Sequence, residues 1–231
     1  MGFLADSFLS ALYLVWSLDR EMLSIVGVSL RVSFSSVFLA SLMGIPLGFA
    51  IALNEFVGRR FLITCLNTLL ALPTVAIGLF VYVFISRRGL FGVFDLLYSQ
   101  SAITIGQTIL ILPLICSLTV AAVSQIDDRY RKTALTLGAG SGQTAFLIFL
   151  EARFGVLAAI IAAFGRVVSE VGISMMLGGN AKGFTRTITT AMALEYDKGE
   201  FVLALALGIV LIALSFVVNI LFHLFQGRVK R

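Results

Sequence analysis

Apolar runs that are long enough to cross a lipid bilayer constrain this chain more than any other feature. A helix rises about 1.5 Å per residue, so about 20 residues cross the hydrocarbon core. The sequence therefore predicts an all-α fold, a polytopic membrane helix bundle that forms one transmembrane domain over residues 1–231. The five predicted transmembrane helices cover residues 24–53, 61–85, 101–124, 155–177 and 201–225.

The composition supports this fold class and excludes others. Apolar residues make up 59% of the chain and charged residues 13%, whereas soluble domains average about 45–50% and about 25%. Basic residues are scattered over the loops instead of gathering on one face, which excludes nucleic-acid binding. Cys65 and Cys116 lie inside apolar runs and there is one histidine, so we predict neither a disulfide nor a metal site.

The N-terminal segment, residues 3–18, is apolar but short, and it carries Asp6. An acidic residue in so short a segment disfavours a membrane crossing. We predict a helix that lies in the interface between lipid and water, with a sixth transmembrane helix as the alternative.

The distribution of Lys and Arg predicts the orientation, because cytoplasmic loops carry an excess of both. With residues 126–150 placed inside, nine basic residues lie on the inner side and six on the outer side. We therefore predict a multi-pass protein of the bacterial cytoplasmic membrane, with its N-terminus outside and its C-terminus inside. The inner residues are Arg59, Arg60, Arg129, Arg131, Lys132, Arg153, Arg228, Lys230 and Arg231, and the outer ones Arg20, Arg87, Arg88, Lys182, Arg186 and Lys198.

Three prolines, Pro46, Pro73 and Pro113, lie inside the first three predicted spans. A proline inside a helix kinks it and frees a backbone carbonyl, which a membrane tolerates only where protein or water satisfies that group. The kinks either fit the helices together or line a path through the bundle, and the sequence leaves both interpretations open.

Residues 126–150 form a charged segment, interrupted by glycine, between two apolar runs. Apolar residues recur at helical spacing from Ile126 to Leu137, which predicts a short amphipathic helix. Glycines at positions 138, 140 and 142 end this helix, and an apolar pattern resumes at residues 144–150. The product is a helix–turn–helix knob on the cytoplasmic side, suited to contact with a partner.

The glycine-rich turn is not a phosphate-binding loop. Such a loop reads G-x-x-x-x-G-K-[ST], but Leu137 stands at the first glycine position relative to Gly142, and Gln143 replaces the lysine. Without that lysine the contact with the β- and γ-phosphates is missing. We predict no cofactor in this chain, so any ATP must be bound by a partner subunit.

The same segment resembles the cytoplasmic loop of permease subunits of bacterial ABC importers of the type I fold, which is patterned E-A-A-x3-G-x9-I-x-L-P. Ala134, Gly138, Ile148 and Leu150 stand at that spacing, while Lys132, Thr133 and Glu151 depart from it. Leu137-Gly138-Ala139 is typical of the oxyanion branch. The resemblance implies a coupling helix that docks on a cytoplasmic ATPase subunit. Its predicted residues are Lys132, Ala134, Leu137, Gly138, Ala139, Ile148 and Leu150.

A second resemblance lies in residues 164–201, which are similar to the corresponding region of molybdate, sulfate and tungstate permeases, and most like the tungstate type. Those proteins share an Arg, then Gly/Ser-Glu-x-Gly, Gly-Asn and Thr-Arg-Thr. The likeness extends over nearly the whole chain from Ser24 onward. The matching residues are Arg166, Glu170, Gly172, Gly179, Asn180, Thr185, Arg186 and Thr187.

Charge and residue size in this region carry their own predictions. Arg166 and Glu170 are one helical turn apart, so they can pair within the membrane, either as a structural pair or as part of a gate. Small residues four apart, such as Gly165 and Ser169, let another helix approach closely, within a subunit or between two copies. The candidate gate or pathway residues are Arg166, Ser169, Glu170, Gly179, Asn180, Thr185, Arg186 and Thr187.

Residues 178–187 support two hypotheses. Their cations and hydroxyls could bind a tetrahedral oxyanion, or the segment could be a solvated loop that only contacts a binding protein. The resemblances imply the membrane permease subunit of an ABC importer for an oxyanion, with tungstate first and molybdate or sulfate as alternatives. They also imply a homodimer with the pore on its two-fold axis, an ATPase subunit and an extracytoplasmic oxyanion-binding protein. Two hypotheses from other functional classes are a membrane anchor of an enzyme complex and a secondary transporter.

Overall fold

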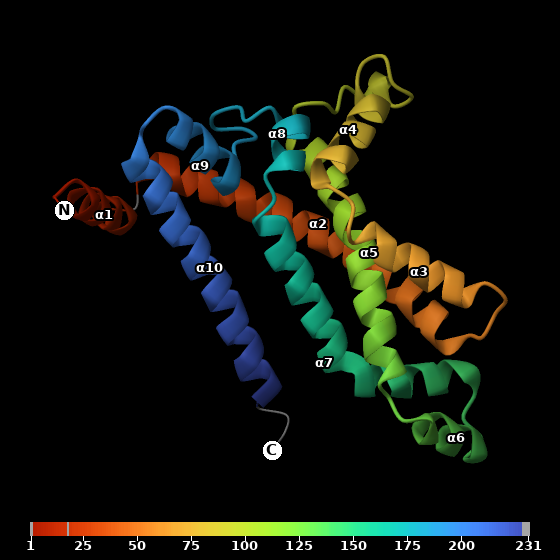
Figure 1. Ribbon diagram of the computed structural model, residues 1–231. Helices are drawn as coiled ribbons and strands as arrows, with labels where there is room; N and C mark the ends of the chain where they lie inside the picture. Colours follow the sequence, from red (N-terminus) through yellow and green to blue (C-terminus); the bar gives the residue numbers. More distant parts are fainter. Residues whose placement is uncertain (1, 18, 228–231) are drawn as a thin grey trace.

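The computed structural model describes residues 2–17 and 19–227, so Arg228, Lys230 and Arg231 of the orientation argument lie outside the described residues. Every regular element within these ranges is helical (Figure 1). The elements are α1 (Gly2–Trp16), α2 (Arg20–Leu53), α3 (Arg59–Leu69), α4 (Thr74–Ile85), η1 (Gly92–Phe94), α5 (Gln100–Ser124), α6 (Asp128–Thr136), α7 (Ser141–Val168), α8 (Gly172–Gly178), α9 (Ile188–Asp197) and α10 (Phe201–Gly227).

Four of these helices, α2, α5, α7 and α10, are each long and apolar enough to cross a membrane. The predicted span at residues 61–85 is instead a broken pair, because α3 and α4 meet at an angle of 98°. Pro73 lies in the break and lacks the amide hydrogen that would continue α3. The prediction of five spans therefore holds when α3 and α4 are counted as one broken span.

The fourth span also differs from its prediction, at both ends. Its helix α7 starts at Ser141, well before the expected residue 155, and stops at Val168. Gly142, expected to break the helix, lies inside its first turn, because the Gln143 carboxamide oxygen accepts from the amide of Gly140 (2.9 Å) and caps the start. After a break at residues 169–171 the short helix α8 follows.

Helix α1 forms where the interfacial helix is predicted, and it packs against α10 through Ala11. Its 15 residues span about 22 Å, less than the hydrocarbon core of about 30 Å. Tyr13 and Trp16 are exposed, and aromatic side chains of this kind favour the membrane interface. The geometry thus agrees with a helix lying at the lipid surface.

The bundle is built around the crossing of α2 with α5, against which α7 packs (Figure 1). Gly44 and Gly48 of α2 face Ile115 and Thr119 of α5, so the two backbones approach closely. These two glycines, four residues apart, therefore mediate close packing within one subunit. A buried polar chain adds to this contact, since Ser36 donates to Gln107 (3.1 Å) and Gln107 donates to Ser174 of α8 (3.3 Å).

The helices alternate between two ends of the molecule. Figure 1 shows α6 and the last turn of α10 at one end, called here the α6 end, and α8 with α9 at the other, called the α9 end. The α3–α4 break lies between these two ends, where α3 reaches the body of the bundle and α4 turns toward the α9 end. The two ends therefore expose different loops on opposite faces of a membrane.

Because α2 and α5 approach closely, we expect one added methyl group between them to lower the stability of the protein. In Gly48→Ala the added Cβ would lie 2.7 Å from the Cβ of Thr119 and 2.9 Å from the carbonyl oxygen of Cys116. Overpacking of this kind costs about 1–3 kcal/mol. We expect Gly48→Ala to lower the melting temperature of the purified protein in detergent. Gly27→Ala is the control on the same helix, because nothing lies within 4 Å of its Cβ position; equal melting temperatures for the two variants would contradict the packing.

Candidate functional site

The turn after α6 has the backbone geometry that glycine requires. The amide of Ala139 donates to the carbonyl of Ala134 and the amide of Gly138 to that of Leu135, each at 3.0 Å. Gly138 has φ +84°, and this pair of bonds with a left-handed residue is the Schellman ending of a helix. The predicted helix break at Gly138 is therefore confirmed, and a side chain at that position would strain the turn.

Two contacts fix the start and the underside of α6. The Asp127 carboxylate accepts from the amide of Arg129 (2.9 Å) and so caps the first turn. Ala134 is buried where α6 meets α7. Ile148 is also buried, in a cluster with Val123 and Ala152. Ala134 and Ile148 thus hold the loop on the bundle, while Lys132 remains exposed.

Apolar side chains are exposed to solvent on α6 and at the turn that follows it. The side chain of Leu137 is 82% exposed at the tip of the turn, and Leu135 and Tyr130 beside it are also exposed. Contiguous exposed apolar patches mark interaction sites, whereas single exposed apolar residues are normal on a protein surface. We call Tyr130, Leu135 and Leu137 the docking patch. Leu150 is partly exposed farther along α7.

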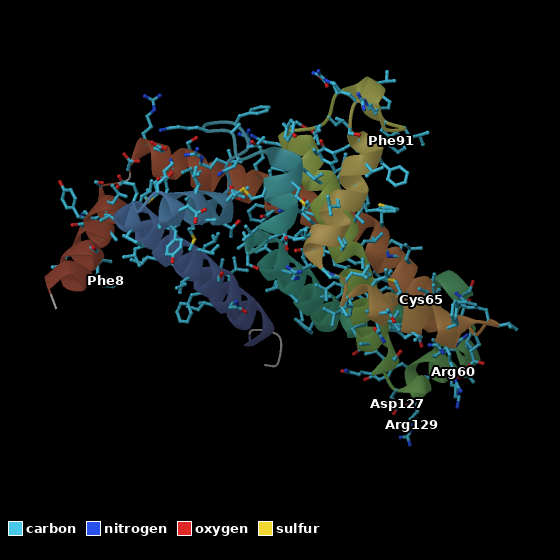
Figure 2. The ribbon with its side chains drawn as sticks, turned by 45° about the horizontal axis from the view of Figure 1, so that its top comes forward. Phe8, Arg60, Cys65, Phe91, Asp127 and Arg129 are labelled. Carbon is cyan, nitrogen blue, oxygen red and sulfur yellow. The ribbon has the colours of Figure 1, made fainter. Side chains whose placement is uncertain are left out.

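A recess lined by both polar and apolar residues lies beside the docking patch. A cavity of about 370 Å³ opens between the end of α2 and the start of α7, with Leu53, Arg131 and Thr144 among its lining residues. Arg59 fixes the end of α2, because its guanidinium donates to the carbonyls of Ile51 (2.9 Å) and Ala52 (3.1 Å). Figure 2 shows Arg60, Asp127 and Arg129 gathered at this end of the molecule.

The break between α7 and α8 centres on a charge pair. The Arg166 guanidinium donates to Glu170 Oε2 at 2.8 Å, so the pair predicted from spacing forms. The other oxygen, Oε1, accepts from the amide of Ile173 (3.3 Å) in the first turn of α8. The Glu170 side chain is 3% exposed and that of Arg166 is 41% exposed. The carboxylate therefore joins the two helix segments from a buried position.

The two broken spans touch at their breaks. A Cβ placed on Gly172, the first residue of α8, would lie 3.1 Å from the hydroxyl of Thr74, the first residue of α4. One turn on, a Cβ on Gly78 would lie 3.0 Å from the sulfur of Met176. Ser169 lies in the break, exposed, with its hydroxyl donating to the carbonyl of Gly165 (2.9 Å). α4 and α8 thus form one packed unit toward the α9 end.

Residues 178–187 form a tight, internally bonded turn. Gly179 and Asn180 both have positive φ, at +66° and +52°. The Thr185 hydroxyl donates to the carbonyl of Gly178 (2.6 Å) and accepts from the amide of Ala181 (2.9 Å). Helix α8 ends at Gly178, one residue after the predicted end of the fourth span, and the Thr185 hydroxyl is occupied by the backbone.

Arg186 and Thr187 also have partners within the protein. Arg186 is nearly buried, and its Nη1 lies 3.8 Å from Glu21 and 3.6 Å from Glu195. The Thr187 hydroxyl accepts from the amide of Thr190 and so caps α9. The sequence brought Arg186 and Thr187 forward as candidates but did not predict that Arg186 pairs with Glu21 and Glu195, because these contacts form only in the tertiary fold.

Thr189 is a further residue that sequence reasoning missed. Its hydroxyl donates to the backbone carbonyl of Glu170 (2.7 Å), so α9 contacts the α7–α8 break directly. A helix break inside a membrane leaves carbonyls without helical partners, and a hydroxyl from a neighbouring helix supplies one. The run of hydroxyls at residues 185, 187, 189 and 190 is the one signal that pointed to such a role.

Comparison with known proteins gives matches over most of the chain. Residues 44–231 match the family described as the binding-protein-dependent transport system inner membrane component. A probable anion ABC transporter permease protein of Haloferax volcanii is 38% identical over 212 residues, which are 90% of this chain and 91% of that protein. The tungstate uptake system permease protein TupB of Peptoclostridium acidaminophilum is 35% identical, covering 98% of this chain and 99% of that one.

The fold also matches a solved structure. An inward-facing conformation of the MetNI methionine ABC transporter superposes with a TM-score of 0.73, covering 91% of this chain and 97% of the matched chain. The sequence identity is 16%, so this likeness shows the fold alone.

The charge pair at the break predicts non-additive effects of substitution. Arg166→Met leaves the Glu170 carboxylate buried without its cation, and Glu170→Gln removes the charge that Arg166 pairs with. Breaking a buried pair costs about 3–5 kcal/mol, and the lower end applies because Arg166 is partly exposed. In thermal unfolding in detergent we expect the double variant to lose less than the sum of the single variants. Strict additivity would contradict an energetic pairing of the two groups.

Proposed function

The chain belongs to the family of binding-protein-dependent transport system inner membrane components, and on this basis we propose that it is the permease subunit of an ATP-driven oxyanion importer. In such a transporter the subunit forms the membrane path and performs no chemistry of its own. ATP is bound and hydrolysed by a separate cytoplasmic subunit. An extracytoplasmic binding protein delivers the ion.

We further propose that tungstate is the transported oxyanion. The observation that carries this assignment is the 35% identity to a tungstate uptake permease over 98% of this chain. Molybdate and sulfate have the same tetrahedral shape and charge, so a permease for either remains the alternative that a competition experiment separates. The amino-acid sequence of residues 164–201, which resembles the tungstate type most, supports the same assignment.

The α6 end is the proposed cytoplasmic end, where the ATPase subunit binds. Basic residues at this end include Arg59, Arg60, Arg129, Arg131 and Lys132, as expected for the cytoplasmic side of a membrane protein. The docking patch offers the apolar centre of a contact, and the recess beside it can receive side chains of the partner. Gly138, Ala139 and Leu150 complete the predicted coupling region around this patch. This orientation places the N-terminus outside and the C-terminus inside.

The gate is proposed at the two helix breaks, where α4 and α8 pack together. Arg166, Ser169 and Glu170 lie at the α7–α8 break, and residues 179–187 connect α8 to α9. ATP binding would shift the dimer from inward-facing to outward-facing by moving these segments about the breaks. A second copy completes the pore. The exposed small residues Ala162, Gly165 and Ser169 suit its approach, since nothing lies within 4 Å of a Cβ on Gly165.

Charge neutrality at the break favours release of the ion over retention. Arg166 could attract an oxyanion, but its charge is balanced by Glu170 at 2.8 Å. Arg186 is likewise placed between two carboxylates. A path of this kind lets an anion pass without holding it, so selectivity would reside in the binding protein.

The substrate assignment predicts a specific pattern of uptake. Cells that express this gene should accumulate labelled tungstate at nanomolar concentration, and cells without it should not. Because we assign tungstate, uptake should resist excess molybdate and excess sulfate. Strong competition by molybdate would instead make this a molybdate or general oxyanion permease. Uptake that does not depend on the gene for any of the three ions would overturn the importer.

The docking patch predicts loss of ATPase binding without loss of the fold. Leu137→Glu places a charge at the exposed tip of the turn, where no buried contact is lost. We expect the ATPase subunit to bind at least about tenfold more weakly, as for loss of an apolar anchor at an interface. Val57→Glu is the control, since Val57 is fully exposed in another loop of the α6 end. Co-purification and uptake measure both, and normal ATPase binding by Leu137→Glu would remove the patch from the interface.

A further inference from the structure

A polar pocket at the α9 end has no part in the transport path described above. Its volume is about 560 Å³, and it lies where the loop between α4 and α5 meets the end of α4. Tyr82, Arg87, Arg88, Asp95 and Tyr98 are among the residues that line it. Two guanidinium groups, one carboxylate and two phenols give the pocket a net charge of +1 and several hydrogen-bond donors.

One of the two arginines has a replaceable partner and the other has none. Arg87 Nε donates to Asp95 Oδ1 at 3.2 Å, and the two side chains are 84% and 70% exposed. An exposed pair of this kind contributes little to stability, so another carboxylate can displace Asp95 at small cost. Arg88 is exposed, and within the described residues it has no ion-pair partner.

Three other cations at the same end are already paired with carboxylates, and the exposed Arg20 lies outside this pocket. Lys182 Nζ lies 2.7 Å from Glu21, and Arg186 also approaches that carboxylate. Lys198 Nζ lies 2.9 Å from Glu195. The pocket at Arg87 and Arg88 is therefore where an acidic group would find uncompensated positive charge together with a shaped cavity.

Tyr98 connects this pocket to the gate region. Its backbone is left-handed (φ +62°), which is uncommon for a residue with a side chain. Its amide donates to the carbonyl of Leu177 in the last turn of α8 (2.8 Å). A Cβ on Gly179 would lie 2.7 Å from its ring, so the glycine makes room for it. The hydrogen bond with the Tyr82 side chain raises the pKa of Tyr98 above that of a free phenol.

The exposure of the arginines decides which kind of anion the pocket suits. A small oxyanion held by solvated guanidinium groups would stay surrounded by water, where the attraction is weak. A protein that covers the pocket excludes that water and strengthens each charge-assisted hydrogen bond. The geometry therefore favours a carboxylate that arrives on a protein surface.

We propose that this pocket is the docking point for an acidic side chain of the extracytoplasmic binding protein, which pairs with Arg88 and displaces Asp95 from Arg87. The proposal rests on the importer function argued above. Docking here presses the binding protein against the Tyr98–Leu177 contact. This contact lies at the last turn of α8, and the hydrogen bond with Glu170 lies at its first turn. Arrival of the loaded binding protein is thereby communicated to the gate.

In the test, tungstate-loaded binding protein is added in increasing concentration to the complete transporter in nanodiscs. The rate of ATP hydrolysis is measured at each concentration. In Arg88→Glu we expect the concentration for half-maximal stimulation to rise about tenfold or more, because an interfacial ion pair becomes a like-charge contact. Arg88→Gln should show a smaller rise in the same direction. Added NaCl should weaken docking to the wild type more steeply than docking to Arg88→Gln. Arg20→Glu, which changes an exposed cation at the same end outside the pocket, should titrate as the wild type does.

Each alternative outcome contradicts a different statement. A wild-type transporter that ignores the binding protein would overturn the importer function and the docking pocket with it. A wild-type response that Arg88→Glu retains unchanged would overturn the pocket alone. Stimulation by sodium tungstate without binding protein, lost in Arg88→Gln, would show that the pocket takes the free ion. If neither Arg88 variant assembled with the ATPase subunit, Arg88 would be needed for folding and not for docking of the binding protein.

Discussion

The requirement that every backbone polar group inside a membrane find a partner within the protein governs this structure. One span is interrupted at residues 70–73, between α3 and α4, and a second break at residues 169–171 separates the end of α7 from α8; each break exposes such groups. The interruptions lie against each other, where Glu170 accepts from the amide of Ile173 and Thr189 donates to the carbonyl of Glu170. These polar contacts thus make the second break tolerable in lipid.

α7 connects the two functional ends of the molecule in a single element. It begins at Ser141, directly after the turn that carries the docking patch, and ends at Val168, next to the charge pair. Its 28 residues span about 42 Å without interruption. A continuous helix transmits displacement with little loss, so under the proposed function a shift at the ATPase contact would move the end that bears Arg166. The break beyond it lets α8 respond without carrying the whole bundle along.

The sequence was informative where one rule acts on neighbouring residues. Apolar length predicted the spans, glycine predicted the turn at Gly138, and one-turn spacing predicted the pair of Arg166 and Glu170. It was uninformative about the 98° bend, because Pro73 indicates a kink but its angle depends on how α4 packs against α8. The partners of Arg186 were likewise out of reach, since Glu21 and Glu195 come to it only through the tertiary fold.

The exposed leucine at the tip of the α6–α7 turn has a consequence for how the cell must produce this protein. Leu137 is 82% exposed to water, at the end of the chain's fold that no lipid covers. If the ATPase subunit binds there as proposed, a copy that lacks this partner leaves the side chain exposed to contact with other unassembled copies. Matched production of the two subunits would then limit such contacts.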